Sequence, residues 1–507
     1  MLIGLGLLGV SAEAETVLRA RLNSDILSTE PGDRRDDITD IIVLHVVEGL
    51  VAPRNDGSIA PMLAKSWDVS TDGKTYRFAL RTDVTFHNGA PMTSAEVVWS
   101  LQRYLRAGSR WRCRLDFSDK GIGKIVSIEA PDAHTVVVGF DRPAPMFLKT
   151  LTKLDCGGTG ILHPDSVAAD GSWKAPIGTG PFMLGEWRHN QSIELLRFPG
   201  YAPLSTPEDG DAGEKKVLVD KVRFLVIPDD SSAAAALLRG SVDIVDNISP
   251  MQIGSLRDKP GIKLDISPIM DNTQLLFQTR DPVIGDVRLR RAIALSIDTV
   301  GLTRAVTFGV SVPNSSPVPT TSAFYGPVEA APRKRDLAEA KRLVKESGYD
   351  GRPIGLITNR RYPINFNTAV LVQAMAQEAG INLQIETLDW ATQFDRYTTG
   401  NYQLMSFGFS PRLDPSFTFA TLIGNKADEP RKTWDTPEAR ALLQRSMETD
   451  DTAQRQAIFD ELHRAFLADV PAVYFFNNSR ITALRDNVVG FHGWPGGHQR
   501  LWGVSVN

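Results

Sequence analysis

Residue patterns that carry catalysis or hold cofactors are incomplete in this sequence. No G-x-S-x-G nucleophile motif occurs. Gly123-Lys124 lacks the first glycine of a P-loop, since Ser118 stands there, and Gly178-Thr179-Gly180 lacks the third glycine of a dinucleotide-binding motif. The histidines are scattered, without the spacing of a zinc site. We therefore expect a protein that is not an enzyme and has neither cofactor nor metal; the histidines are His45, His87, His134, His163, His189, His463, His492 and His498.

Arginine and aromatic side chains are the residues best suited to bind a small ligand. On an extended chain, alternate side chains point to one side, so Arg110, Arg112 and Arg114 would form one cationic face beside Trp111. A guanidinium suits bidentate recognition of a carboxylate or phosphate. A solvated basic loop is the alternative for this segment.

A second candidate region joins a predicted strand, 354–358, to a predicted helix, 366–378. Loops at the carboxyl ends of strands line crevices in open α/β sheets. This makes Asn365 and the later Trp390 candidate ligand contacts. Core packing is the alternative for Trp390.

The carboxyl-terminal tail carries the last candidates. Trp494 could reach a ligand cleft, or it could pack in the core. His492 and His498 flank a glycine-rich turn, where they could touch a metal or serve a surface or packing role.

Length and composition predict several packed units. A chain of 507 residues is too long for a single core, so two or three sub-domains are expected. Its 42% hydrophobic and 23% charged residues are ordinary for a soluble globular protein. A net charge of −4 argues against nucleic acid as a partner, because binding a polyanion would need a basic surface. Nothing after residue 15 approaches 18 consecutive apolar residues, so no membrane span is predicted.

The stretch 63–105 predicts a definite order of elements. Asp72-Gly73 is a turn pair, and 76–80 alternates apolar and polar residues as a half-buried strand does. A second short strand is predicted over 84–86. It is closed by a turn in which His87 would hold the loop.

A helix then follows, because Thr93 and Glu96 have capping-box spacing before apolar residues at helical intervals. This order resembles the signature of the extracytoplasmic solute-binding proteins that serve peptide, nickel and opine ABC transporters, family 5. The segments 178–182 (GTGPF) and 286–292 (DVRLRRA) resemble two further motifs of that family. The resemblance therefore covers nearly the whole mature chain.

The resemblance implies an α/β fold of two lobes, the type II periplasmic-binding-protein fold with an extra sub-domain in lobe I. Two lobes joined by a hinge can close on a ligand. It also implies a periplasmic, monomeric protein whose partners are a small-molecule ligand and the transmembrane permease subunits of an ABC importer. The expected division is a signal peptide remnant at 1–14, lobe I at 15–50, the extra sub-domain at 51–177, lobe I again at 178–265, lobe II at 266–477, and the lobe I return with the tail at 478–507.

The start of the chain and its cysteines agree with export. Leu2 to Val10 is apolar and Ala12-Glu13-Ala14 has the form of a signal-peptidase site, so the mature chain would begin near Glu15. The basic segment that usually precedes such a run is missing, and a buried N-terminal strand is the alternative. In an exported protein Cys113 and Cys156 could form a structural disulfide; buried free thiols are the alternative.

The resemblance also indicates where a ligand would lie. Nickel-chelate-binding relatives place an inward-facing tryptophan where Trp111 stands. The family's Asp-Pro, here Asp414-Pro415, follows an aromatic-containing strand, so Phe409 would supply an apolar wall. Peptide-binding relatives carry an acid three residues before that aspartate, to bind the peptide's α-ammonium. Here that position is Pro411, and Arg412 follows it.

These departures predict an anionic or polyhydroxylated ligand, such as an opine, a sugar-phosphate conjugate or a carboxylate metal chelate. A buried ammonium needs a carboxylate partner, whereas a guanidinium suits anions. A surface Arg412 paired with Asp414 is the alternative. A di- or oligopeptide-binding protein that holds the ammonium elsewhere, on Asp25, Glu30 or Asp389, is the other possibility.

Overall fold

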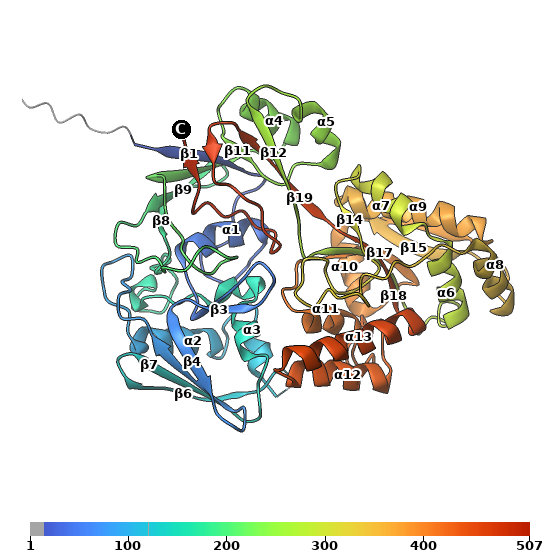
Figure 1. Cartoon of the computed structure of the whole chain (residues 1–507), viewed down its shortest axis with the longest axis horizontal. Coiled ribbons are helices and arrows are strands. Elements are labelled where there is room, and N and C mark those ends of the chain that lie inside the picture. Colours follow the sequence, from blue (N-terminus) through green and yellow to red (C-terminus); the bar gives the residue numbers. More distant parts are fainter. Residues whose placement is uncertain (1–14, 120) are drawn as a thin grey trace, which may run out of the picture.

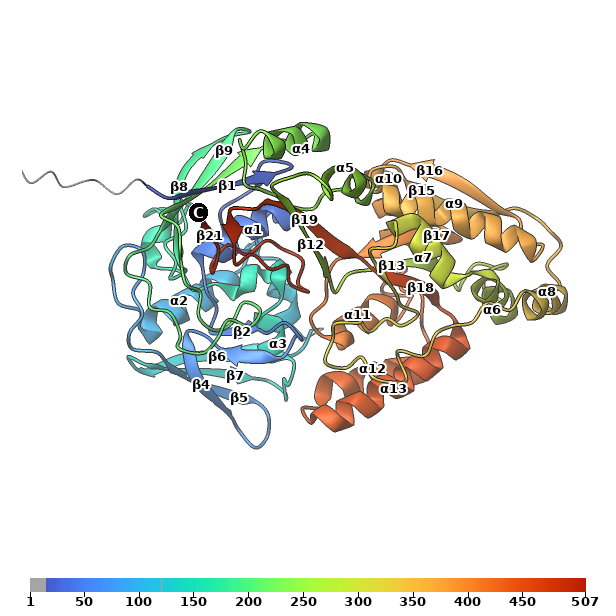
Figure 2. The ribbon, with the colours of Figure 1, turned by 45° about the horizontal axis from the view of Figure 1, so that its top comes forward.

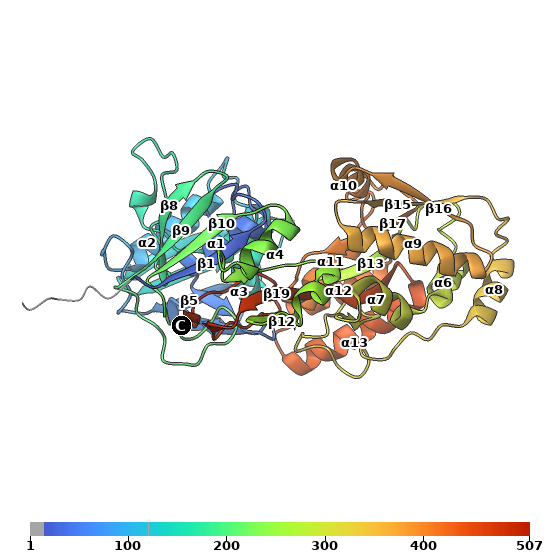
Figure 3. The same ribbon diagram turned by 90° about the horizontal axis from the view of Figure 1, so that it is seen from above.

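The computed structural model describes residues 15–119 and 121–507, and it places two lobes beside each other (Figure 1). The predicted signal peptide, 1–14, falls outside the described residues. Seen from above in Figure 3, lobe I contains both the first and the last strands, and lobe II is formed by the middle of the chain. The predicted two-lobe α/β fold is confirmed.

Lobe I is built on a seven-stranded mixed sheet with the order β12 (Ile262–Pro268), β19 (Ser479–Arg485), β11 (Ile244–Val245), β1 (Val17–Leu22), β10 (Lys221–Val226), β9 (Ser192–Arg197), β8 (Phe182–Arg188). β1 runs parallel to β10 and to β11, and the other neighbours are antiparallel. The alternating apolar residues of β1, Leu18, Ala20 and Leu22, are buried in a core with Ile41 of the first helix. The helices are α1 (Asp37–Val46), α4 (Asp230–Leu238) and α5 (Ile253–Leu256), and β20 (Val488–Val489) pairs with β21 (Ser505–Val506).

Lobe II is built on a six-stranded sheet with the order β14 (Val312–Pro313), β18 (Ala472–Asn477), β13 (Asn272–Phe277), β17 (Leu404–Phe409), β15 (Ile354–Asn359), β16 (Leu383–Leu388). Leu275 and Phe277 of β13 lie in one core and Leu276 in another, because helices cover both faces of the sheet. The helices are α6 (Val287–Ser296), α7 (Thr299–Thr307), α8 (Leu337–Glu346), α9 (Pro363–Glu378), α10 (Trp390–Thr399), α11 (Pro415–Leu422), α12 (Pro437–Glu448) and α13 (Thr452–Asp469).

An extra sub-domain of lobe I lies beside α12 and α13 of lobe II (Figure 1). Thr93 caps its helix α2 by accepting from the amide of Ala95, and Glu96 accepts from the amide of Thr93, so the capping box is confirmed. The strand predicted over 84–86 is wrong: only one bridge forms there, Thr85 with Pro91. The elements are β2 (Val51–Pro53), β3 (Ile59–Pro61), α2 (Ser94–Leu105) and α3 (Phe147–Leu151), with an antiparallel sheet in the order β4 (Ala64–Val69), β5 (Thr75–Leu80), β7 (Thr135–Phe140), β6 (Ile125–Asp132).

His87 connects this sub-domain to the Gly-Thr-Gly segment. Its Nε2 donates to the Gly180 carbonyl at 3.0 Å, and its Nδ1 accepts from the Gly178 amide at 3.3 Å. Burial lowers the pKa of His87 to about 4, so the ring is neutral and has the one donor and one acceptor that these contacts need. A Cβ on Gly178 would lie 2.2 Å from the Val46 carbonyl, so only glycine fits there.

Cys113 and Cys156 are joined in a disulfide within the sub-domain, with Cα atoms 5.5 Å apart. Of the two arrangements that the sequence allowed, the structure therefore has the bridge. Of the helices in the described residues, none is long and apolar enough to cross a membrane.

Two neighbouring strands connect the lobes, as Figure 2 shows between β12 and β13 and between β18 and β19. β12 pairs antiparallel with β19 up to Pro268 and Ser479, and β13 then pairs with β18 in the other sheet. The chain crosses at 269–271 on the way out and at Asn478 on the way back. The expected boundary at 266 lies inside β12, two residues before its end. These two adjacent crossings form the hinge.

Candidate functional site

A cavity of about 410 Å³ lies between the lobes beside the hinge. This volume is within the range of small-molecule sites. Lobe I and its sub-domain contribute Asp37 and Asp155, the hinge contributes Asp271 and Asn478, and lobe II contributes Arg412. A ligand there would touch both lobes at once.

Lobe II lines the cavity with the loops that follow β15, β16 and β17. Asn365 and Tyr362 come after β15, Trp390 after β16, and Phe409 ends β17. The Trp390 ring stacks at 5.7 Å on Phe407 and meets Tyr362 edge-on at 5.0 Å. Asn365 and Trp390 therefore follow the carboxyl ends of two strands, as expected, and Phe409 ends a third; that these residues bind the ligand stays a prediction.

Arg412 also lines the cavity and is half-buried. Its guanidinium donates only to carbonyls of its own loop, Ser410 at 3.4 Å and Pro411 at 3.1 Å. Within the described residues it has no carboxylate partner inside 4 Å, so the alternative pair with Asp414 is absent. The guanidinium remains able to bind an anion.

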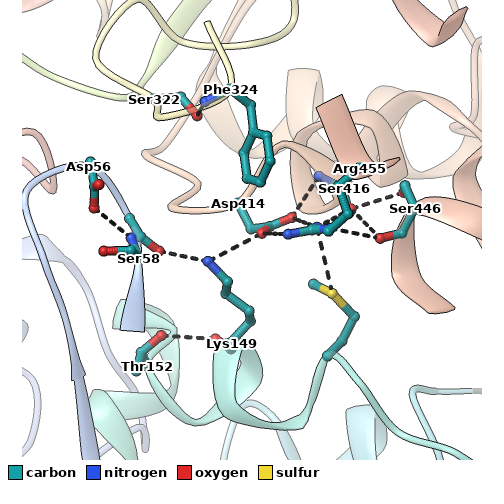
Figure 4. A network of polar contacts seen from close by, with 12 residues as sticks. Asp56, Ser58, Lys149, Thr152, Ser322, Phe324, Asp414, Ser416, Ser446 and Arg455 are labelled. Atoms are coloured by element: carbon teal, nitrogen blue, oxygen red, sulfur yellow. Dashed lines mark hydrogen bonds and ion pairs between the residues drawn. The ribbon is translucent and has the colours of Figure 1, made fainter. Parts of the chain in front are cut away.

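Asp414 is instead held by two other cations, as Figure 4 shows. Arg455 of α13 contacts both of its carboxylate oxygens, at 2.7 and 2.9 Å. Lys149 of α3 lies 3.5 Å from it and also donates to the Gly57 carbonyl at 2.8 Å. Since Lys149 belongs to the sub-domain and Asp414 to lobe II, this ion pair crosses between the lobes.

Most other charges at the cavity wall are also paired. Arg480 binds Asp246 at 2.6 Å and Lys153 binds Asp116 at 2.6 Å. Burial opposes ionisation of Asp155, but the nearby positive charges, that of Arg412 foremost, outweigh it and lower the pKa of this carboxyl.

Asp271 differs from these groups. Its carboxylate accepts from the backbone amide of Asn478 at 2.9 Å and from its Nδ2 at 2.7 Å. Within the described part of the chain it has no Lys, Arg or His partner inside 4 Å. Burial is the main cause that raises the pKa of Asp271, to about 7.

The predicted wall at Arg110, Trp111 and Arg112 does not line the cavity, which corrects that expectation. Trp111 is 5% exposed, stacks on Tyr104 and Phe117, and donates its indole N–H to the Cys156 carbonyl at 2.9 Å. Arg110 is exposed and pairs with Asp33, and Arg112 is exposed. The alternation puts the arginines in solvent and the tryptophan in the sub-domain core.

Trp494 supports the cavity from behind. It is 1% exposed and packs with Met270 and Leu413, while the neighbouring Gly497 and His498 line the cavity. The His498 ring meets Trp494 edge-on at 4.9 Å, which corresponds to the packing alternative.

The three acids considered as ammonium anchors have other partners. Asp25 accepts from the Trp187 indole, Glu30 pairs with Arg103, and Asp389 caps α10 by accepting from Thr392. None of them is among the residues that line the cavity.

The sequence did not identify three parts of the cavity wall: Asp271, Asn478 and the sub-domain residues between 149 and 155. Both Asp271 and Asn478 stand next to strand ends, which is a weak signal. Only their pairing across the hinge brings them to one place.

The sequence model described as bacterial extracellular solute-binding proteins, family 5 Middle, matches residues 58–430. This chain belongs to that family. The predicted family resemblance is therefore confirmed.

Relatives and solved structures are similar to this family-5 protein over most of its length. It is 26% identical to the probable D,D-dipeptide-binding periplasmic protein DdpA of Escherichia coli K12, over 85% of this chain and 81% of that protein. The structure of AgaA of A. tumefaciens R10 with agropinic acid has a TM-score of 0.75, 24% identity, and covers 97% of this chain and 99% of that one. DppA of Helicobacter pylori with the peptide STSA has a TM-score of 0.77 at 24% identity, with 97% and 98% covered. The family consists of binding proteins for ABC importers.

Proposed function

We propose that this chain is the exported, periplasmic solute-binding subunit of an ABC importer, and that its ligand carries an anionic group held by Arg412. The two lobes would close on the ligand and present it to the permease subunits, without catalysis and as a monomer. The position of Arg412 carries this proposal, because it lines the cavity and, among the described residues, its guanidinium donates only to its own loop. A half-buried guanidinium gains most from a charge-assisted pair with a carboxylate or phosphate.

An opine, a sugar-phosphate conjugate or a carboxylate metal chelate would supply that group beside the aromatic wall of Trp390 and Phe409. Agropinic acid in AgaA is one such ligand in a protein of the same fold. The volume of about 410 Å³ suits a solute of this size.

A short peptide is the second candidate. Its terminal carboxylate could bind Arg412, and Asp271 lies in the same cavity without a cation partner among the described residues. The dipeptide- and peptide-binding relatives support this class to the same degree.

Calorimetry with an opine, a nickel–histidine chelate and a dipeptide would test the proposal. Replacing Arg412 by Ala should weaken the anionic ligand by about 2 kcal/mol, roughly 30-fold, because a charge-assisted hydrogen bond is lost. Arg304→Ala, at an exposed position of α7, is the matched control and should bind as the unchanged protein does. The anion-binding role would be contradicted if the protein bound a peptide tightly and none of the other solutes, and if Arg412→Ala left the peptide's dissociation constant unchanged.

A further inference from the structure

We propose that Asp271 and Asn478 form a subsite for an ammonium group, so that the ligand carries a positive group at the hinge as well as the anionic group at Arg412. This inference rests on the proposed function, since it concerns the same cavity. An ammonium offers only hydrogen-bond donors, and the subsite offers acceptors. The cargo would then be a zwitterion, such as a peptide or an amine-containing opine.

The acceptors follow from the contacts at the hinge. Asn478 donates twice to the Asp271 carboxylate, through its backbone amide and its Nδ2. Because the amide nitrogen of the side chain faces the carboxylate, the assignment of its Oδ1 is fixed. That Oδ1 is buried and has no hydrogen-bond partner among the described residues. Both residues line the cavity.

Asn365 adds a third polar group to the same rim. It lines the cavity, is 5% exposed, and its Oδ1 is also buried without a partner within the described chain. The side-chain amide lies next to Gly408, where a Cβ would be 3.6 Å from Oδ1 and 3.5 Å from the Asn272 carbonyl. Asn365 thus approaches the backbone that immediately follows Asp271.

Among the described residues, no cation pairs with Asp271. Arg480, whose positive charge lowers the pKa of Asp271, is itself paired with Asp246, which accepts from its Nε at 3.0 Å and from its Nη2 at 2.6 Å. Asp37 adds a further negative charge nearby. A buried carboxylate is costly unless it is protonated or paired. A ligand ammonium would provide the pairing.

Strand register places this subsite at the edge of the sheet from which the loop to Arg412 leaves. Asn272 of β13 pairs with Phe409 of β17, so Asp271 continues the same edge as the loop that leads to Arg412. The two charged groups of the ligand would therefore be bound along this one edge of the cleft. A solute with only an anionic group would leave Asp271 unsatisfied.

Asp271 also ties together the two hinge crossings, so a structural role must be separated from a binding role. Asp271→Asn removes the charge and keeps an oxygen that can accept from the Asn478 backbone amide, while its new NH2 group requires the Asn478 side chain to turn its Oδ1 toward it. Asp265→Asn, on β12 and outside the cavity, is the matched control. Asp271→Asn should melt at the same temperature as the unchanged protein or above it, since a buried charge is removed.

The test measures dissociation constants of the full chain for dialanine and trialanine with free or N-acetylated amino termini, and for octopine. We expect the free peptides to bind about 10- to 100-fold more tightly than the acetylated ones. In Asp271→Asn this difference should fall below about threefold, and Asp265→Asn should keep it. The comparison of free and acetylated peptides in the unchanged protein needs no variant.

Two results would overturn the subsite. One is equal binding of free and acetylated peptides by the unchanged protein, and the other is full discrimination in Asp271→Asn. If Arg412→Ala abolishes binding while either result holds, the proposed function stands and the subsite fails. If no solute of the panel or of the calorimetric series binds, the proposed function itself fails.

Discussion

Asp414 and Asp271 are two carboxylates on the wall of one cavity, and their surroundings are opposite. Asp414 is 0% exposed, caps α11, and is bound by Arg455 and Lys149. Burial opposes its ionisation, but the two cations outweigh burial and lower its pKa, whereas at Asp271 burial prevails and raises the pKa to about 7. Burial alone therefore does not distinguish the two carboxylates; what distinguishes Asp271 is that no cation pairs with it among the described residues, which makes it the candidate binding group.

The largest effect is expected from removing the main partner of Asp414. Arg455→Met should destabilise the protein by about 3–5 kcal/mol, because it leaves a buried carboxylate with only a partly exposed lysine. Thermal melting of the full chain measures this loss. Arg464→Met, at an exposed position of the same helix, is the control and should change little. An unchanged melting temperature in Arg455→Met would mean that Asp414 needs no partner.

A smaller effect of opposite sign is expected at Asp271. The raised pKa means that the folded protein holds a proton there that the unfolded chain loses near pH 4. Its contribution to stability is fully present below pH 4 and is lost as the pH rises through about 7. Asp271→Asn should thus stabilise the unliganded protein more at pH 8 than at pH 5, by about 2–3 kcal/mol.

Urea unfolding at the two pH values measures this difference. The charged groups near Asp271 are Asp37 and Arg480, and His498 also lines the cavity, so the double variant Asp271→Asn/His498→Gln separates their contributions. Equal stabilisation at pH 5 and pH 8 would show that Asp271 does not titrate in this range.

The smallest effect concerns the contact between the lobes. Lys149→Met should leave the Asp414–Arg455 pair intact and weaken closure by about 1 kcal/mol, since Lys149 is partly exposed. Ligand dissociation should become about fivefold faster, as stopped-flow fluorescence would measure. Lys124→Met, exposed on the same sub-domain, is the control. A rate that does not change would show that this ion pair adds nothing to closure.

The scaffold was predictable because its signals are local. The capping box of Thr93 and Glu96 and the strands and helix over 354–386 depend on residues a few positions apart. The same locality placed Asn365 and Trp390 at the cavity, because loops at the carboxyl edge of a sheet share one side.

The orientation of Trp111 was predicted wrongly and Asp271 was not identified, because both depend on residues that are distant in the sequence. Whether a tryptophan faces a ligand or a core depends on what packs against it, here Tyr104, Phe117 and the Cys156 carbonyl. The importance of Asp271 depends on Asn478, 207 residues later in the chain. No spacing rule connects residues that meet only after both lobes have formed.

The order of strands in lobe I has a consequence for the timing of folding. β19, near the end of the chain, inserts between β12 and β11 in the sheet that β1 begins. Lobe II is contiguous and can complete its sheet once β18 has been made, whereas lobe I must wait for 479–485. A chain that ends before Ser479 would leave β11 and β12 with unpaired backbone groups around a missing strand. The lobe that begins the chain is thus the last to be finished.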